Sequence, residues 1–235
     1  MKYKRVLLKL SGEILSGNED GIFSQKALKT LVEDIVKIHR MGADVAIVIG
    51  AGNIIRGKEL VEKLSIDRVK ADYTGMLATV INGMVLQDML EQNDCRTRMM
   101  TAINMSQVAE PFIRRKAISH LNKNRIIIFT GGTGNPFFTT DTASVLRAVE
   151  IDADVVLKGT KVDGVFNKDP VTDKSAKKFN KIEYSNVIKD ELRVMDMTAI
   201  SLSKENNIPI IVFNIMKEGN LVGILEGKEI GTLVS

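Results

Sequence analysis

The chain has 235 residues, of which 44% are hydrophobic and 26% charged, the balance of a globular protein with room for one large or two small domains. The net charge of +4 is mildly basic, but no dense run of Lys and Arg interleaved with aromatic residues indicates nucleic-acid binding. Cys95 is alone, so no intrachain disulfide can form and we expect a cytoplasmic location. His39 and His120 lie too far apart in the sequence to suggest a zinc site. The first apolar run, residues 6–10, is too short for a signal peptide or a membrane span.

Short apolar runs alternate with amphipathic stretches along the chain. The predicted elements are, in chain order, a strand over residues 6–10, a helix over 24–41, a strand over 45–49, a helix over 73–90, a strand over 98–103, a helix over 110–122, a strand over 126–130, a helix opening at 139–141, a strand over 155–158, a helix over 196–206, a strand over 208–213, a short helix over 221–225 and an edge strand over 232–234. Apolar strands separated by helices are typical of a parallel sheet covered on both faces. The sequence therefore predicts an α/β fold.

Two of the predicted helices carry signals at their ends. Ser24 should cap the helix over 24–41, and Gly42 should end it. Asp72 is the expected cap of the helix over 73–90. That helix is apolar on more than one face, so it needs cover on more than one side, either from a second subunit or from the rest of a single domain.

The helix over 110–122 is expected to turn Phe112 and Ile113 inward. Residues 171–191 are polar and rich in lysine, which predicts a hairpin or a lid-like excursion. No internal repeat, low-complexity tract or clean linker divides the chain, so we expect one domain over residues 1–235.

The strongest chemical signal lies between residues 126 and 170. A predicted strand runs into the glycine-rich turn at residues 131–134, and Pro136 prevents a helix from starting there. Thr139 can then cap a helix, and the Asp141 carboxylate suits its positive end. The chain returns as a strand and breaks into a polar loop that ends at Asp169. Loops of this kind bind phosphates through backbone N–H groups.

Glycines, lysines and carboxylates gather where the predicted strands end, while the strand bodies are apolar. The groups at these ends are Lys9, residues 50–53, residues 131–134, residues 158–163 and Asn214. Ligands bind beyond the carboxyl ends of the strands in an open parallel sheet. Neither a G-x-x-x-x-G-K-[ST] motif nor a complete G-x-G-x-x-G is present. Two glycine loops and several cations predict two phosphorylated ligands, and phosphoryl transfer needs positioning, Mg²⁺ and cations rather than a protein nucleophile.

Several sequence segments together closely resemble the bacterial uridylate (UMP) kinases, a branch of the amino-acid kinase superfamily. The segments are Lys9-Leu10-Ser11-Gly12-Glu13, Gly50-Ala51-Gly52-Asn53 with Arg56-Gly57, Asp72 with Gly75-Met76-Leu77-Ala78-Thr79, Thr133-Gly134-Asn135-Pro136-Phe137-Phe138-Thr139-Thr140-Asp141, Lys161-Val162-Asp163-Gly164-Val165-Phe166 and Val194-Met195-Asp196. The likeness runs from residue 5 to about residue 234. It implies a three-layer αβα sandwich with an acceptor-binding part over about 1–150 and an ATP-binding part over about 151–235. It also implies the reaction of ATP with UMP to give ADP and UDP.

The resemblance assigns roles position by position. The implied catalytic residues are Lys9, Asp141 and Asp196. The implied ATP-binding residues are Lys9, Leu10, Ser11, Gly12, Gly52, Arg56, Thr160, Phe166 and Asp169. The implied UMP-binding residues are Ala51, Asp72, Thr133, Gly134, Asn135, Pro136, Phe137, Phe138, Thr139 and Thr140. Mg²⁺ is expected to enter with ATP, near Asp141, with no side chain assigned as its direct ligand.

Two further features bear on that resemblance. Ala51 stands where the family usually has glycine, and its methyl group restricts a positive φ and a close approach to phosphate. Such kinases are typically homohexamers built from dimers, activated by GTP and inhibited by UTP. Residues 16–21 correspond to part of the GTP-response region, but their polar sequence alone specifies no regulatory response. The alternatives are a kinase of the same superfamily with a carboxylate or carbamate acceptor, or a non-catalytic pyrimidine-nucleotide sensor.

Overall fold

The structure, a computed structural model, describes residues 1–17, 21–170, 172–173, 175–192 and 194–235. Its strands are β1 (Arg5–Leu10), β2 (Asp44–Ile49), β3 (Thr97–Thr101), β4 (Glu110–Pro111), β5 (Ile126–Thr130), β6 (Val155–Thr160), β7 (Lys181–Ile182), β8 (Ile210–Asn214) and β9 (Thr232–Val234). Its helices are α1 (Glu13–Ser16), α2 (Gln25–Arg40), α3 (Gly57–Leu64), α4 (Arg68–Glu91), α5 (Arg114–Asn122), α6 (Thr140–Glu150), α7 (Tyr184–Lys189), α8 (Met197–Asn206) and α9 (Asn220–Glu226).

The described strands form one sheet in the order β4-β3-β5-β2-β1-β6-β8-β9-β7. All neighbouring pairs are parallel except β8 and β9, which run antiparallel. The predicted α/β fold around a mainly parallel sheet is therefore confirmed. The prediction that β9 lies at the edge is wrong, because Lys181 and Ile182 of β7 pair with its outer side.

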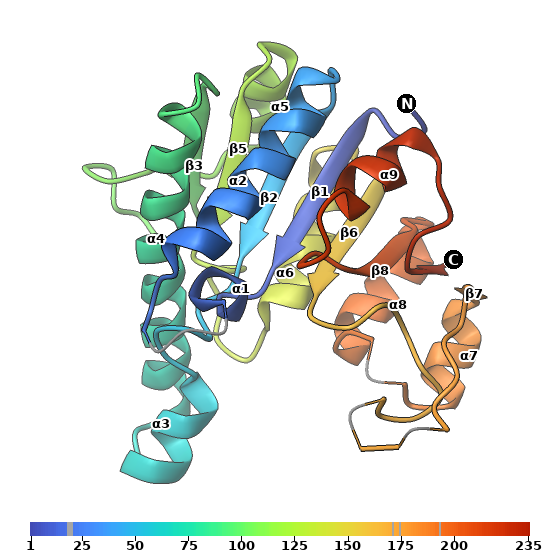
Figure 1. Cartoon of the computed structure of the whole chain (residues 1–235). Helices are drawn as coiled ribbons and strands as arrows, with labels where there is room; N and C mark the ends of the chain where they lie inside the picture. Colours follow the sequence, from blue (N-terminus) through green and yellow to red (C-terminus); the bar gives the residue numbers. More distant parts are fainter. Residues whose placement is uncertain (18–20, 171, 174, 193) are drawn as a thin grey trace.

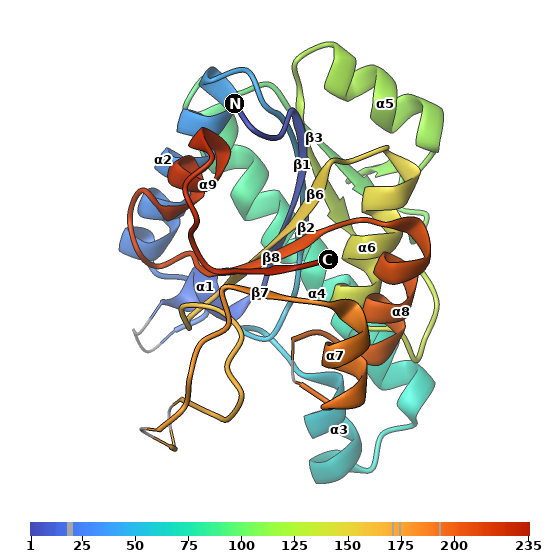
Figure 2. The same ribbon diagram turned by 90° about the vertical axis from the view of Figure 1, so that its right-hand side faces the viewer.

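Helices cover both faces of the sheet and make a three-layer sandwich (Figure 2). One apolar core joins the sheet to α1, α2, α4 and α9, and a second core joins it to α5, α6, α7 and α8. Successive side chains of β1 alternate between these layers, so Leu8 and Leu10 lie in the first core and Leu7 in the second. This alternation directs Lys9 toward the α6 side. In Figure 1 the arrowheads of β1, β2 and β6 point to one edge, where α1 and the segment after β6 lie.

The predicted cap residue is confirmed for α2 but not for α4. Ser24 caps α2 as predicted, since its Oγ accepts a hydrogen bond from Ala27 N at 3.2 Å, and Gly42 follows the helix with φ +95°. Asp72 is not the cap of α4. The helix begins one turn earlier, where Asp67 accepts a hydrogen bond from Lys70 N at 3.2 Å.

The helix predicted over 110–122 is shorter than expected. Glu110 and Pro111 pair with β3, because proline holds the residue before it in an extended conformation, and the helix begins only at Arg114. Phe112 packs inward with its ring edge against Phe129, as predicted. Ile113 is the N-cap residue and is 46% exposed, so its predicted inward position is wrong.

Among the residues that the structure describes, helix α4 buries one side and leaves the other exposed. The exposed apolar residues Tyr73, Leu77, Ile81 and Met84 recur at helical spacing along it. The described part of the chain therefore does not cover both of its apolar faces. The predicted excursion over 171–191 contains β7 and α7, and an antiparallel bridge joins Phe166 to Lys178. Residues 171 and 174 of that excursion lie outside the described residues.

Candidate active site

A buried charged cluster of Lys9, Asp141 and Lys158 lies at the carboxyl ends of the central strands. Lys9 and Lys158 are direct partners in the β1–β6 register, so both side chains leave the same face of the sheet. Helix α6 begins beneath them and presents Asp141. Lys9 Nζ lies 2.5 Å from Asp141 Oδ1, and Lys158 Nζ lies 2.8 Å from Asp141 Oδ2. One carboxylate therefore holds two ammonium groups side by side.

Burial and charge act on this cluster in opposite directions. Burial raises the pKa of Asp141, but the charges of Lys9 and Lys158 outweigh it and hold that pKa below its usual value. For Lys158, burial is the largest effect and lowers the pKa, although Asp141 acts to raise it. Two cations against one buried anion leave a net positive charge. Such a site favours the phosphate oxygens of a ligand.

Asp196 ties the start of α6 to the start of α8. It caps α8 by accepting a hydrogen bond from Ala199 N at 2.8 Å. The hydroxyl of Thr142 donates to its Oδ1 at 2.8 Å, and the hydroxyl of Thr139 donates to its Oδ2. Its charge also raises the pKa of Lys158, against the larger lowering by burial. Asp196 thus acts on the cluster in two ways. Its hydrogen bonds hold the start of α6, which carries Asp141, and its negative charge acts on Lys158.

The loop after β5 is held in shape by its own side chains and by α4. Gly131 has φ +74° and donates its N–H to Thr79 Oγ1 at 2.8 Å. Thr133 Oγ1 accepts a hydrogen bond from Asn135 N at 3.1 Å. Phe137 adopts φ +70°, which is strained for a non-glycine residue, and donates its N–H to Asp72 Oδ2 at 2.8 Å.

Asp72 therefore binds the loop after β5 instead of capping α4. Arg68 Nε lies 2.9 Å from both of its carboxylate oxygens, and the Arg68 guanidinium lies over the Phe137 ring at 5.6 Å. Together these three residues join the loop to the second turn of α4. Arg68 was not predicted for the site, and its position one turn before Asp72 becomes meaningful only once α4 is known to start there.

Two cavities open beside the charged cluster. The first, of about 190 Å³, includes in its lining Ala51, Asp72, Phe138, Thr139 and Thr140, all from the predicted UMP set. The second, of about 600 Å³, includes Lys158, Thr160, Phe166 and Asp169. The rest of the predicted UMP set, Thr133, Gly134, Asn135, Pro136 and Phe137, belongs to the same loop as Phe138.

Of the remaining predicted ATP residues, Leu10 is the fully buried last residue of β1, whereas Ser11, Gly12, Gly52 and Arg56 lie on the turns after β1 and β2. A Cβ atom at Gly12 would lie 2.7 Å from Gly52 N, so only glycine permits this approach. Arg56 forms an ion pair with Glu13 across the two turns. Ala51 does not adopt a positive φ, so its methyl group is accommodated without backbone strain.

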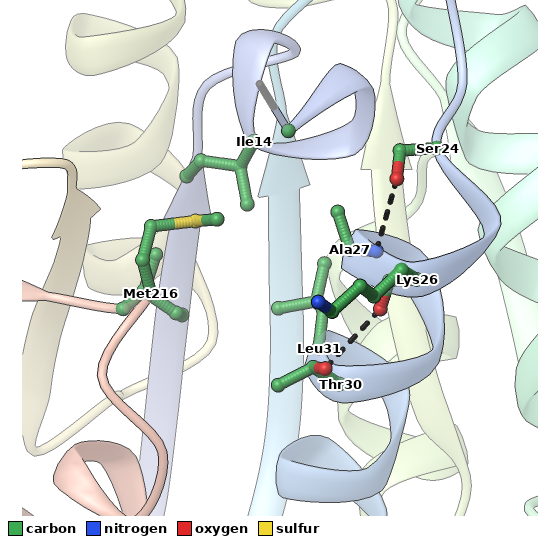
Figure 3. Close-up of a pocket in the computed structure, with 9 residues that line it drawn as sticks. Ile14, Ser24, Lys26, Ala27, Thr30, Leu31 and Met216 are labelled. Carbon is green, nitrogen blue, oxygen red and sulfur yellow. Dashed lines mark hydrogen bonds between the residues drawn. The ribbon is translucent and has the colours of Figure 1, made fainter. Parts of the chain in front are cut away.

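A third cavity, of about 270 Å³, lies away from the charged cluster between α1, α2 and the segment after β8. Figure 3 shows Ile14 and Met216 on one side of it and Leu31 of α2 on the other. The Ser24 hydroxyl accepts from Ala27 N and the Thr30 hydroxyl donates to Lys26 O, so these polar groups are already engaged (Figure 3). Among the described residues that line it, only Lys26 carries a charge. This cavity lacks the groups that phosphoryl transfer requires.

Comparison with known proteins places this geometry in a family. The model of the amino acid kinase family matches residues 4–214. The chain belongs to the amino acid kinase family. The matched residues include β1 and β6, whose pairing brings Lys9 and Lys158 together.

Solved structures of family members match the whole chain. The UMP kinase from Bacillus anthracis is 43% identical with a TM-score of 0.97, over 100% of this chain and 97% of that one. The UMP kinase from Ureaplasma parvum is 36% identical with a TM-score of 0.93, and the uridylate kinase from Archaeoglobus fulgidus is 25% identical with a TM-score of 0.75, each over 100% of both chains.

Proposed function

We propose that the protein transfers the γ-phosphoryl group of ATP to UMP, giving ADP and UDP. Its amino acid kinase family membership and its likeness to solved UMP kinases over their full length support this reaction. The observation that carries the proposal is the charged cluster beside two cavities: Lys158 lines the larger one, and Thr140, the chain neighbour of Asp141, lines the smaller one. A phosphate oxygen of UMP attacks the γ-phosphorus as the bond to the ADP oxygen breaks. Because that acceptor is already an anion near neutral pH, no strong base is needed.

The residues divide between binding and charge stabilisation. The Lys9 ammonium contacts the phosphoryl group in transfer, and Asp141 fixes its position. The 190 Å³ cavity holds UMP, with Asp72 on the ribose. The 600 Å³ cavity holds the adenosine part of ATP, near Thr160, Phe166 and Asp169. This corresponds to an acceptor part over about 1–150 and an ATP part over about 151–235.

Mg²⁺ is proposed to arrive with ATP. Both Asp141 oxygens face lysine ammonium groups, so this carboxylate is placed to orient Lys9 and Lys158 rather than to coordinate the metal. Within the described part of the chain, no group of three or more His, Cys, Asp or Glu side chains is arranged to hold a metal ion. The ion would neutralise charge on the phosphates, which supply its ligands.

The proposal also includes the assembly of the protein into an oligomer and its location in the cell. The exposed apolar residues of α4, Leu77, Ile81 and Met84, support a homo-oligomer with this helix at a subunit contact. A hexamer activated by GTP and inhibited by UTP would follow the pattern of similar kinases. Cys95 is buried and unpaired, which suits a cytoplasmic location. No helix in the described ranges is both long and apolar enough to cross a bilayer.

The test is ADP release from Mg-ATP with UMP, CMP, dUMP, carbamate, aspartate and acetylglutamate offered one at a time. Turnover with UMP and none with the carboxylate or carbamate acceptors is expected. Turnover with one of those acceptors instead would assign the protein to a sister kinase. Saturable UMP or UTP binding without turnover of any acceptor would indicate a sensor.

A further inference from the structure

Buried Asn82 and partly buried Asn53 form a side-chain pair beside the turns after β1 and β2, and this pair belongs to neither the charged cluster nor the two cavities. Asn82 lies on α4 and is 0% exposed. Its carboxamide nitrogen donates to Asn53 Oδ1 at 2.8 Å, and the Asn53 nitrogen donates back to Asn82 Oδ1 at 3.1 Å. The two carboxamides thus form a reciprocal pair between the helix and the loop after β2.

The remaining hydrogen atoms of this pair are bonded to the backbone. Asn82 Nδ2 donates to Gly50 O at 2.7 Å, at the start of the first glycine loop. Asn53 Nδ2 donates to Ile22 O at 2.8 Å. All four N–H groups of the two carboxamides are therefore satisfied, and for the buried Asn82 this avoids a desolvation penalty.

The Asn53 side chain also restricts the turn after β1, which contains Gly12. A Cβ atom at Gly12 would overlap Asn53 Oδ1, so the Asn53 carboxamide lies directly against the turn after β1. Gly50 N in turn donates to Leu10 O at 2.8 Å. One carboxamide pair therefore contacts α4 and both turns that are proposed to hold phosphates.

We propose that Asn82 is a positioning residue for phosphoryl transfer, which acts through Asn53 and Gly50 to fix the two phosphate-binding turns against α4. Apolar side chains of the same shape would fill this space without needing hydrogen-bond partners. A fully satisfied polar pair instead selects one arrangement of the backbone it bonds. The inference rests on the proposed function for its kinetic consequence, because only a kinase needs these turns held for in-line transfer.

The experiment compares Asn82→Leu with Leu90→Ala in the full-length protein. Asn82→Leu keeps the volume of the side chain and removes all three of its hydrogen bonds. Leu90 is also buried on α4, two turns further along, and its truncation destabilises the helix away from the turns. We expect kcat/KM for UMP to fall by about 10- to 100-fold in Asn82→Leu, since small displacements of positioning groups cost that much. Leu90→Ala should keep kcat/KM within about twofold, at an equal or larger loss of thermal stability.

Asn53→Ala provides a milder second variant, because the Asn82 bond to Gly50 O survives in it. It should lower kcat/KM by less than Asn82→Leu does. A loss of kcat/KM in Asn82→Leu no greater than that in Leu90→Ala would overturn the proposal.

Hydrogen–deuterium exchange makes the result independent of turnover. Amides of residues 50–53 and 11–13 should exchange faster in Asn82→Leu and at the wild-type rate in Leu90→Ala. Wild-type exchange rates at these turns in Asn82→Leu would refute the positioning role. If the wild-type protein shows no UMP turnover, the proposed function fails, and the exchange comparison still decides whether Asn82 fixes the turns.

Discussion

Asp141 should be essential for stability as well as for turnover, because it is the shared counterion of two buried lysines. The side chains of Lys9 and Lys158 are only 9% and 14% exposed. Asp141→Asn keeps the shape of the side chain and removes its charge, which leaves two adjacent buried ammonium groups. Removing one partner of a buried ion pair costs about 3–5 kcal/mol. At roughly 2–4 °C per kcal/mol for a chain of this size, the Tm should fall by roughly 6–20 °C.

The matched control is Asp44→Asn at the opposite end of the sheet. Asp44 also contacts two cations, Lys4 and Arg5, and its side chain is 14% exposed against 15% for Asp141. Lys4 is largely in solvent, so Asp44→Asn should cost less stability and leave turnover intact. Differential scanning calorimetry with a UMP-dependent ADP assay measures both effects.

The pH dependence of folding stability provides a second test of the same prediction. Burial lowers the pKa of Lys158, so between that lowered value and the ordinary 10.5 the unfolded state binds more protons than the folded state. Stability therefore rises with pH in this window. Loss of the Asp141 charge should lower that pKa further, so the deficit of Asp141→Asn should shrink as the pH rises. Asp141→Asn is expected to lower the unfolding free energy by about 3–5 kcal/mol at pH 7. A loss of only about 1 kcal/mol or less would refute the role of Asp141 as the shared counterion.

Three further predictions concern single side chains. Lys9→Ala should lower kcat by about two to three orders of magnitude while circular dichroism shows a folded protein, and an unchanged kcat would remove Lys9 from the mechanism. Asp72→Asn should raise the KM for UMP by about 10- to 100-fold, through loss of charge-assisted bonds at the cavity, whereas a change confined to the KM for ATP would reverse the assignment of the two parts. Burial raises the pKa of Tyr184 to about 12, so the stability it contributes is present below pH 10 and is lost as the pH rises toward 12. Tyr184→Phe should remove that part of the alkaline loss in urea melts, and an identical pH profile would contradict the assignment.

The strands and their ends could be predicted from the sequence because they depend on local pattern. Apolar runs identified β1 and β2, and Lys9 at the end of such a run marked the edge where the site lies. Ser24 carried a cap signal that had no nearby competitor. In each case the deciding interactions lie within a few residues along the chain.

What the sequence could not predict depends on pairing between distant elements. The sequence pattern places Lys158 at the sheet edge but indicates no role for it, because its approach to Asp141 follows from the β1–β6 register. Asp67 and Asp72 are equally good cap residues, and only the point where the chain turns helical distinguishes them. Asn82 is a polar residue within an apolar helix, and no local signal points to its contact with Asn53.

Transfer of label from ATP to UDP is the sharpest test of UMP as the phosphoryl acceptor. The protein is incubated with Mg-ATP radiolabelled in its γ-phosphate and with unlabelled UMP, and the nucleotides are separated by chromatography. With wild-type protein the label should appear in the β-phosphate of UDP, and with Lys9→Ala the rate of its appearance should fall by about two to three orders of magnitude. Label that remains in ATP, or that is released only as inorganic phosphate, would contradict the assignment of UMP as the acceptor.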